Sequence, residues 1–517
     1  MKIVLIQPPA LQSQDSYSSL TQPPLGMAYL AAYAKRLGHS VTIIDGVGEA
    51  IESTYAWPDA PGLLVQGLDL DVIANKVPKD ADVIGFSCMF THAWPMVRTL
   101  MHKVKAAVPN AYFIGGGEHC TSMYSQVLKD APIDLVIYGE GEVTFGEVLA
   151  KLESGHVKYW RGQPGVCFID EDGQPVKNAR QDRIKEPDSL PYPDWDTLKI
   201  SAYMDSHIFM GPSGKGARSI PMLATRGCPY ACTFCASPGM WTRMYRTRDP
   251  KKVVDEMQHW QEKYGANDFQ FQDLTAIVRK EWIVDFCKEI IGRGMNITWQ
   301  IPVGTRSEAI DREVTDLLIA SGCAHVTYAP ESGSVNILKA IDKKVNLDRL
   351  VDSAQAALDS GMRVCLFMIV GFPQETKEDL KLTYQFIRRM ARLGIHEIAV
   401  STFVPLPGTE LFGTTNKIKP IVVNDAYCYE MTGATRLFHI RSWNPNFTDT
   451  QLRAMKLGAM SQFYALSYLT HPTRIWKTIK ALVTSEQETK SDRVLAEFAQ
   501  KLRRKAASAA RDILPTR

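Results

Sequence analysis

The sequence has no apolar run long enough to cross a membrane. A spanning helix needs roughly 18 or more consecutive apolar residues, and no run in the 517 residues reaches that length. The first ten residues, MKIVLIQPPA, contain one lysine and an apolar run that is too short for a signal sequence and stops at two prolines. We therefore expect a first β-strand here, no transmembrane segment and a cytoplasmic protein.

The chain also has little net charge. A formal charge of +3 over 517 residues gives no general field that attracts nucleic acid, so we expect no nucleic-acid partner. Apolar residues make up 45% and charged residues 22% of the chain, as in ordinary globular proteins. The length predicts two or three domains.

Cysteine is too sparse for a disulfide scaffold, with ten residues in the whole chain. Three of them, Cys228, Cys232 and Cys235, lie within eight residues of one another in ATRGCPYACTFCASP. The other seven are scattered, and we expect most of them to be small buried side chains: Cys88, Cys120, Cys167, Cys287, Cys323, Cys365 and Cys428.

Residues 1–152 alternate short apolar runs with helical patterns, which predicts a doubly wound α/β domain with a parallel sheet, Rossmann-like or flavodoxin-like. The apolar runs have almost no polar alternation, as is typical of strands covered on both faces. Ligands bind beyond the carboxyl ends of such strands. The predicted binding loops are therefore QPPALQ, DGVGE, SCMFTHAW and GGGEHCT.

Three further segments follow. Residues 153–207 are rich in turns, with a hairpin pattern at IDEDGQPV, and are predicted to be a connector. Residues 208–412 contain six strand-helix steps, too few for an eight-unit barrel, so we expect an open, partial (β/α)6 barrel. Residues 413–517 are predicted to be a mainly helical cap that ends in a basic, solvated tail, KLRRKAASAARD.

The spacing of the three clustered cysteines indicates an iron-sulfur cluster. They follow the first predicted barrel strand, where one loop can fold three thiolates around a cuboidal cluster. Three ligands for four irons leave one iron open to a small molecule. The alternative is a structural zinc site, which requires four ligands and usually two CxxC pairs, and no second pair is present.

The CxxxCxxC spacing, with Phe234 just before the third cysteine, resembles the radical S-adenosylmethionine (SAM) superfamily. The resemblance implies a 4Fe-4S cluster whose open iron binds SAM and whose electron cleaves SAM to methionine and a 5'-deoxyadenosyl radical. It also implies contacts with SAM from Phe234 and from residues in FQDLT, APESGS and GFPQET: Asp273, Glu331, Ser332 and Gly371. Taken singly, these polar residues are equally typical of helix caps.

The phrases PPLGMAYLAAYAKRLGH, GGGEHCT and YGEGE are similar to the cobalamin-binding domains that precede many radical SAM barrels. The resemblance implies that Gly115, Gly116 and Gly117 let cobalamin approach the backbone. The DxHxxG motif of classical cobalamin domains is absent, since DGVGE follows the second strand, and no histidine ligand is predicted. His92 and His119 lie on candidate loops, where a hydrogen-bonded histidine is the commoner case. A degenerate domain without cobalamin is the alternative.

Within the superfamily, TRGCPYACTFCASPGMW, WQIPVGTRSEAI and YAPESGS resemble the group that includes the anaerobic magnesium-protoporphyrin IX monomethyl ester cyclase. That group also contains methylases. It implies an enzyme that abstracts a substrate hydrogen and transfers methyl from methylcobalamin to an unactivated centre, or, alternatively, a radical oxidative cyclase or rearrangement enzyme. The implied partners are a small-molecule or natural-product substrate and an electron donor such as flavodoxin or ferredoxin.

Two other classes are disfavoured. A non-catalytic cobalamin-binding protein has no use for the cysteine triplet. A methylthiotransferase needs a second cluster, for which Cys88 and Cys120 are too few and too far apart. Aromatic residues of the C-terminal unit either line a substrate site or pack in a core: Tyr427, Tyr429, Phe438 and Trp443.

Overall fold

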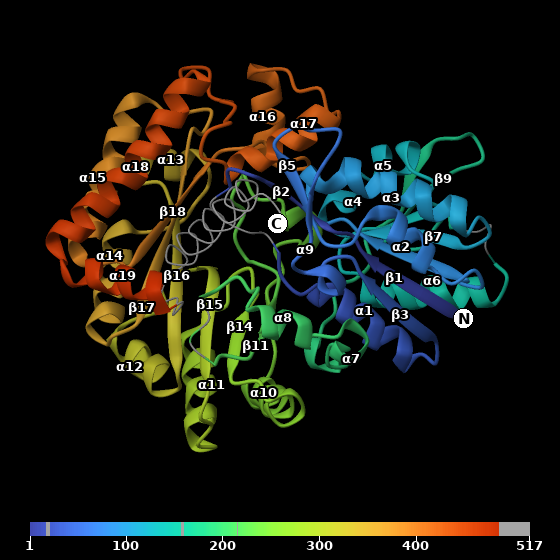
Figure 1. Cartoon of the computed structure of the whole chain (residues 1–517), viewed down its shortest axis with the longest axis horizontal. Coiled ribbons are helices and arrows are strands. Elements are labelled where there is room, and N and C mark those ends of the chain that lie inside the picture. The colour runs from blue at the N-terminus through green and yellow to red at the C-terminus, as the bar shows by residue number, and fades with distance from the viewer. Residues whose placement is uncertain (17–20, 157–159, 213, 215, 485–517) are drawn as a thin grey trace, which may run out of the picture.

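The computed structural model describes residues 1–16, 21–156, 160–212, 214 and 216–484. Two α/β units lie side by side, the N-terminal one in blue to teal and the second in green to orange (Figure 1). No described helix is both long and apolar enough to span a bilayer. The basic tail KLRRKAASAARD lies outside the described residues.

The first unit is built on a seven-stranded sheet of order β10-β9-β8-β7-β6-β1-β3. Five neighbouring strands run parallel: β1 (Lys2–Gln7), β3 (Ser40–Asp45), β6 (Val83–Ser87), β7 (Tyr112–Gly116) and β8 (Leu135–Ile137). Successive residues of β1 belong to different cores, with Ile3 and Leu5 on one face and Val4 and Ile6 on the other. Because both faces are covered, the strands have no polar alternation, and the predicted doubly wound fold is confirmed.

Helices fill the two faces of this sheet. The connecting helices are α1 (Leu25–Arg36), α2 (Leu70–Lys76), α3 (Trp94–Ala107), α4 (Glu118–Ser122), α5 (Tyr124–Asp130) and α6 (Glu142–Glu153). The core that contains Ile3 also holds buried residues of α1 and α6, whereas the core that contains Val4 holds those of α2, α3 and α5. A small antiparallel sheet, β2 (Ala10–Ser13), β4 (Thr54–Ala56) and β5 (Leu63–Gln66), lies beside them.

The segment 153–207 extends the first sheet. Its hairpin, β9 (Val166–Ile169) and β10 (Pro175–Lys177), pairs antiparallel with β8 and forms the sheet edge. Two short helices follow, α7 (Trp195–Leu198) and α8 (Ser201–Ser206), and the Tyr203 hydroxyl of α8 donates to the Asp45 carboxylate at the end of β3.

The second unit is a six-stranded parallel sheet whose strands follow chain order. They are β11 (Ser219–Met222), β14 (Asp268–Phe271), β15 (Thr298–Thr305), β16 (Cys323–Glu331), β17 (Arg363–Val370) and β18 (Glu397–Thr402). Amphipathic helices connect them: α10 (Pro250–Tyr264), α11 (Lys280–Gly292), α12 (Arg312–Ala320), α13 (Val335–Ala340), α14 (Leu347–Asp359) and α15 (Lys377–Leu393). Within the described chain β11 and β18 do not pair, so the barrel is open as predicted.

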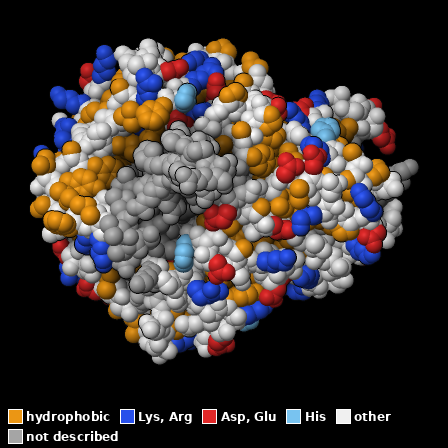
Figure 2. Space-filling model, in the orientation of Figure 1, with side chains coloured by type: hydrophobic (Ala, Val, Ile, Leu, Met, Phe, Trp, Pro, Cys, Tyr) orange, Lys and Arg blue, Asp and Glu red, His pale blue; other side chains and the backbone are white. Residues whose placement is uncertain are grey.

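The α-helices that follow β18 in the described chain are α16 (Glu410–Ile418), α17 (Asp425–Glu430), α18 (Asp449–Thr470) and α19 (Thr473–Thr484). Helix α18 packs on α15 and on the edge strand β18, and α17 contacts α3 of the first unit. Exposed apolar side chains in α18 and α19 include Leu469 and Trp476. Figure 2 shows hydrophobic side chains gathered at the edge of the molecule where these helices run.

Two of the four C-terminal aromatic residues lie in a core. Tyr427 and Trp443 are buried, with ring centroids 6.1 Å apart. The Tyr429 hydroxyl accepts from the Trp57 indole at 2.8 Å, and Phe438 is 55% exposed. None of the four lines the cavity described below, so the structure favours packing over substrate contact for this set.

Candidate functional site

One cavity of about 390 Å³ lies where the first unit meets the barrel. Its first wall comes from the carboxyl ends of β1, β6 and β7 and includes Pro8, Cys88 and Gly116. The opposite wall contains Arg226 and Gly227 from the start of the cysteine loop, and Trp241 from the segment after it. A ligand in this cavity touches both units.

All three glycines of the GGG motif line the cavity, but only Gly116 has room for a Cβ. A Cβ on Gly115 would meet the Ile133 side chain at 2.4 Å, and one on Gly117, which has φ +104°, would meet the Cys88 carbonyl oxygen at 2.6 Å. A Cβ on Gly116 would meet nothing closer than the Ile137 carbonyl oxygen at 3.8 Å. Gly115 and Gly117 are therefore required by the fold itself, whereas Gly116 leaves room for a ligand.

The two candidate histidines differ in position. His92 lines the cavity, and burial lowers its pKa to about 4. His119 lies behind the wall, with its Nδ1 3.2 Å from the Thr91 hydroxyl and its ring against Trp94, and burial lowers its pKa to about 3. Both rings are neutral near pH 7, and only His92 lies within reach of a ligand.

Cys228, Cys232 and Cys235 share one half-buried loop. The loop is held by its backbone, because Thr233 N–H donates to the Ile341 carbonyl and the Thr233 carbonyl accepts from Leu411 N–H. The seven scattered cysteines are all buried, in agreement with the sequence-based expectation.

The chemistry of this loop suits a metal cluster. Burial raises the pKa of Cys228, and it raises the pKa of Cys232 to about 11, with the neighbouring thiols adding to both shifts. Without metal, burial and the neighbouring thiols therefore favour the protonated forms of Cys228 and Cys232. Iron reverses this preference because it binds thiolates and supplies positive charge.

Cationic side chains lie next to the thiols. Arg306, directly after β15, is 8% exposed and has its guanidinium 4.0 Å from the centre of the Tyr230 ring, inside the cysteine motif. Lys343 bonds Glu331 at 2.9 Å, and both Lys343 and Arg306 counter the rise in the Cys228 pKa. Sequence reasoning missed both cations, although the position of Arg306 at a strand's carboxyl end is a usable signal.

Glu331, one of the predicted SAM contacts, lies beside the cysteine loop. It ends β16 with φ +69°, its side chain is 10% exposed, and it acts electrostatically on Cys232. Its neighbour Ser332 faces the other way, toward α15, with its hydroxyl 3.1 Å from that of Thr383. The structure therefore brings Glu331 beside the cysteine loop and pairs the Ser332 hydroxyl on the side of α15, and the SAM contacts of both residues stay predictions.

Gly371 and Phe234 also lie near each other. Gly371 has φ +87°, and a Cβ there would meet the Leu452 side chain of α18 at 2.6 Å. The next residue, Phe372, has its ring centroid 5.8 Å from that of Phe234. Phe372 is fully buried, so of these two rings only the half-buried Phe234 can contact a ligand beside the cysteine loop.

Asp273 holds the backbone that leads to the cysteines, and its predicted contact with SAM stays a prediction. The side chain is fully buried, and its carboxylate accepts from Ala224 N–H at 3.1 Å, from the Thr225 hydroxyl at 2.5 Å and from Thr225 N–H. Residues 224 and 225 directly precede and begin the short strand β12 (Thr225–Arg226). Both oxygens are occupied by this segment, and Asp273 does not line the cavity.

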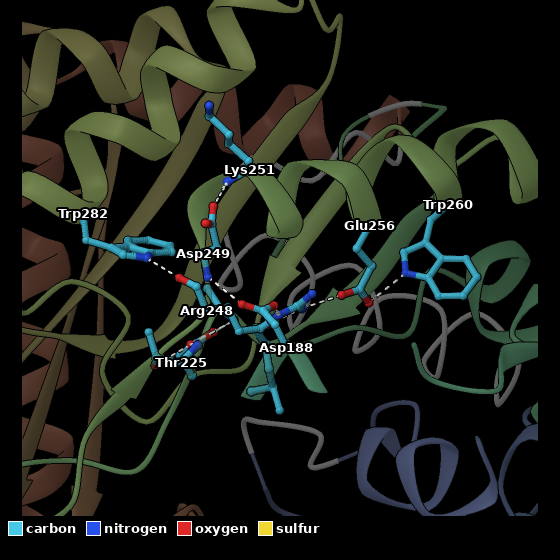
Figure 3. Close-up of polar contacts among 11 residues, drawn as sticks. Asp188, Thr225, Arg248, Asp249, Lys251, Glu256, Trp260 and Trp282 are labelled. Carbon is cyan, nitrogen blue, oxygen red and sulfur yellow. Dashed lines mark hydrogen bonds and ion pairs between the residues drawn. The ribbon is translucent and has the colours of Figure 1, made fainter. Parts of the chain in front are cut away.

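Arg248 supports the same segment from the barrel side. It donates to the Leu223 carbonyl at 3.0 Å and to Asp188 at 2.7 Å, and it pairs with Glu256, whose other oxygen accepts from Trp260. Figure 3 shows these side chains converging behind Thr225. The approach to the cysteine loop is thus fixed by buried charged groups.

The stability of the protein should depend on pH through Glu375. This buried carboxylate accepts from Gly371 N–H at 2.5 Å, and burial raises its pKa to about 7 from 4.5. The folded state therefore holds the proton more tightly than the unfolded state does, so its stabilising effect is complete below pH 4.5 and is lost as the pH rises through 7. When the pH rises from 5 to 8, the unfolding free energy of the unaltered protein should fall. The fall should be about 2 kcal/mol smaller in Glu375→Gln, which has no proton to lose.

Urea unfolding at both pH values measures this difference. Glu52→Gln, at an exposed glutamate, is the control and should leave the pH dependence unchanged. Parallel pH profiles for the Glu375→Gln variant and the unaltered protein would contradict the prediction.

Family models match both units. The model of the radical SAM superfamily matches residues 222–387, and the model of the B12 binding domain matches residues 18–149. The order predicted from sequence is therefore confirmed.

Relatives cover most of the chain. An uncharacterized methyltransferase of Pyrococcus horikoshii is 28% identical over 80% of this chain and 82% of its own length. Cytidylyl-2-hydroxyethylphosphonate methyltransferase of Streptomyces wedmorensis is 28% identical over 79% of this chain and 80% of its own length. Anaerobic magnesium-protoporphyrin IX monomethyl ester cyclase of Rubrivivax gelatinosus is 29% identical over 75% of this chain and 66% of its own length.

A solved structure shares the fold of nearly the whole chain. It is the radical S-adenosylmethionine methyltransferase TsrM from Kitasatospora setae, with cobalamin and a 4Fe-4S cluster bound. The TM-score is 0.64 at 15% identity, over 90% of this chain and 88% of that one.

Proposed function

We propose that this chain, whose residues 222–387 match the radical SAM model and whose residues 18–149 match the B12 binding domain model, is a cobalamin-dependent radical SAM methyltransferase. The observation that carries the proposal is the shared cavity, which Gly116 lines from the first unit and Gly227 lines from the start of the cysteine loop. In such a protein the cluster supplies the electron that cleaves SAM to a 5'-deoxyadenosyl radical, and cobalamin carries the methyl group to an unactivated centre of the substrate.

The chain's own residues bind and orient these groups. Cys228, Cys232 and Cys235 hold the cluster, and Arg306 lies beside them as a partner for the carboxylate of SAM. Glu331 accepts from the ribose hydroxyls. The substrate is a small molecule that enters the cavity, where the two units exclude water.

Two further parts of the proposal concern partners and place. The electron comes from a flavodoxin or ferredoxin, and the reaction takes place in the cytoplasm. The resemblance to enzymes that need a reduced cluster supports both.

A cyclase is the second candidate, supported by the 29% identity with the magnesium-protoporphyrin ester cyclase. The two reactions leave different products from SAM. A methylase that draws its methyl group from SAM leaves S-adenosylhomocysteine as well as 5'-deoxyadenosine, whereas a cyclase leaves only 5'-deoxyadenosine.

The test is anaerobic purification and reconstitution with iron, sulfide and hydroxocobalamin, followed by SAM and a chemical reductant. We expect both 5'-deoxyadenosine and cobalamin-dependent S-adenosylhomocysteine. The absence of both products would sink the proposal, and 5'-deoxyadenosine alone would favour the cyclase. A non-catalytic cobalamin-binding protein would bind cobalamin without either product.

Gly116→Phe should remove cobalamin and spare the cluster. A Cβ at this position meets nothing closer than 3.8 Å, and Gly116 lines the cavity, so we expect the phenyl ring to enter the cavity instead of displacing the core. Overfilling a fitted site costs about 1–3 kcal/mol, which corresponds to cobalamin binding that is roughly tenfold to a hundredfold weaker.

Cobalamin absorbance and iron content per chain measure the two effects separately. Gly116→Ala, whose methyl group meets nothing within 3.8 Å, is the matched control and should retain most cobalamin. Unchanged cobalamin binding in Gly116→Phe would place the cofactor elsewhere.

A further inference from the structure

A buried network of four charged side chains joins the two units next to the cavity. Arg226, two residues before Cys228, donates to Glu140 at 2.8 Å through Nη1 and to Glu142 at 2.7 Å through Nη2. Arg183 donates to the second oxygen of Glu140 at 2.9 Å. All four side chains are between 3% and 8% exposed.

The network reaches both walls of the cavity. Glu140 and Glu142 alternate with Gly139 and Gly141 in the YGEGE motif of the first unit, and all four residues line the cavity. Arg226 lines the opposite wall at the start of the cysteine loop. A shift of either loop is therefore transmitted to the other through the Arg226 guanidinium, while Arg183 links Glu140 to the Trp241 carbonyl after the cysteines.

Aromatic rings hold that guanidinium in place. Its carbon lies 5.0 Å from the centre of the Tyr29 ring on α1 and 5.9 Å from that of Trp241, beyond the cysteines. A planar fork between two rings can bind two carboxylates at once, which a lysine ammonium does not match. The rings therefore fix both the direction and the distance of the contacts between the Arg226 guanidinium and the two glutamates.

The free energy of this network indicates that it positions the two loops and adds little to stability. Burying four charges gains little stability, because desolvation offsets most of the attraction, and apolar replacements are often neutral. Arg248 shows the contrast: it also pairs with two carboxylates, Asp188 and Glu256, but Figure 3 shows that this network supports the barrel side of the segment.

We propose that Arg226 is a positioning residue that couples the two cofactor sites: through Glu140 and Glu142 it sets the spacing between the glycine wall and the cysteine loop. This inference rests on the proposed function. When cobalamin orders the YGEGE loop, the contacts of Arg226 with Glu140 and Glu142 also order the segment from Arg226 to Cys228, where the SAM site begins. SAM then binds more tightly when cobalamin is present, and the reverse holds by linkage.

The test measures SAM affinity of the reconstituted full chain with and without hydroxocobalamin, from the change in the electron paramagnetic resonance signal of the reduced cluster. Coupling of this kind is typically fivefold or more, and we expect roughly a tenfold difference in the unaltered protein. The double variant Arg226→Met, Glu142→Gln leaves Glu140 paired with Arg183, and its two affinities should agree within about twofold.

The matched control is Arg248→Met with Glu256→Gln, which removes the same charges from the other network. It should keep the roughly tenfold difference, even if the protein loses stability. A roughly tenfold difference that persists in the Arg226 variant would overturn the proposal. So would an unaltered protein that binds cobalamin and the cluster but shows the same SAM affinity with and without hydroxocobalamin.

Failure of the proposed function is a separate outcome. If the chain binds neither cofactor, the proposed function is wrong, and hydrogen exchange of the cofactor-free chain decides on the Arg226 contact. We expect faster hydrogen exchange at both residues 139–142 and residues 226–228 in the Arg226 variant. In the Arg248 variant, exchange should be faster only at residues 226–228. Unchanged exchange at residues 139–142 in the Arg226 variant would overturn the inference.

Discussion

Cys228→Ala should abolish formation of 5'-deoxyadenosine from SAM and reduce cluster iron from about four atoms per chain to a small fraction of that amount. The loop supplies only three thiols, and one iron must stay open for SAM, so no spare ligand exists in the motif. Two thiolates cannot hold a cuboidal cluster against dissociation. Iron analysis after anaerobic reconstitution and chromatographic measurement of 5'-deoxyadenosine test both effects.

Cys287→Ala is the matched control. Cys287 is buried on α11, outside the residues that line the cavity, and its removal should lower stability modestly while leaving iron content and SAM cleavage intact. Full cleavage of SAM by Cys228→Ala would refute the assignment of the cluster ligands.

Local patterns in the sequence predicted most of the fold. The alternation of apolar runs and amphipathic helices is a short-range property, and it identified both parallel sheets and the open barrel. The hairpin β9–β10 was visible as a hairpin, but its pairing with β8 is a contact between segments separated by a helix. Nothing in a single sequence reports which edge a hairpin will join.

The candidate site was predictable only where its residues share a motif. The cysteines occupy one loop, and their spacing alone indicates their chemistry. Arg226 and its partners Glu140 and Glu142 are 84 to 86 residues apart, so their pairing becomes evident only in the fold. The direction in which a side chain faces was equally hidden, as Ser332 and Asp273 show.

The second large effect concerns Asp273, where the structure and the family resemblance lead to different results. Asp273→Ala removes the acceptor for three donors in a fully buried segment: Ala224 N–H, Thr225 N–H and the Thr225 hydroxyl. Each buried donor without a partner costs about 1–3 kcal/mol, so we expect the three together to lower the unfolding free energy by roughly 3–9 kcal/mol. The segment that leads to Cys228 then loses its fixed position, and iron content should fall several-fold.

Asp273→Asn separates support of the loop from contact with SAM. The amide keeps one acceptor oxygen and the side-chain shape, so iron retention should lie between that of Asp273→Ala and that of the unaltered protein. In both variants the chains that do retain a cluster should bind SAM with unchanged affinity, because both carboxylate oxygens of Asp273 accept from the backbone before the cysteines. Iron content per chain and SAM titration of the reconstituted fraction distinguish the two roles. Full iron content with weakened SAM binding would restore the SAM contact and refute the structural role.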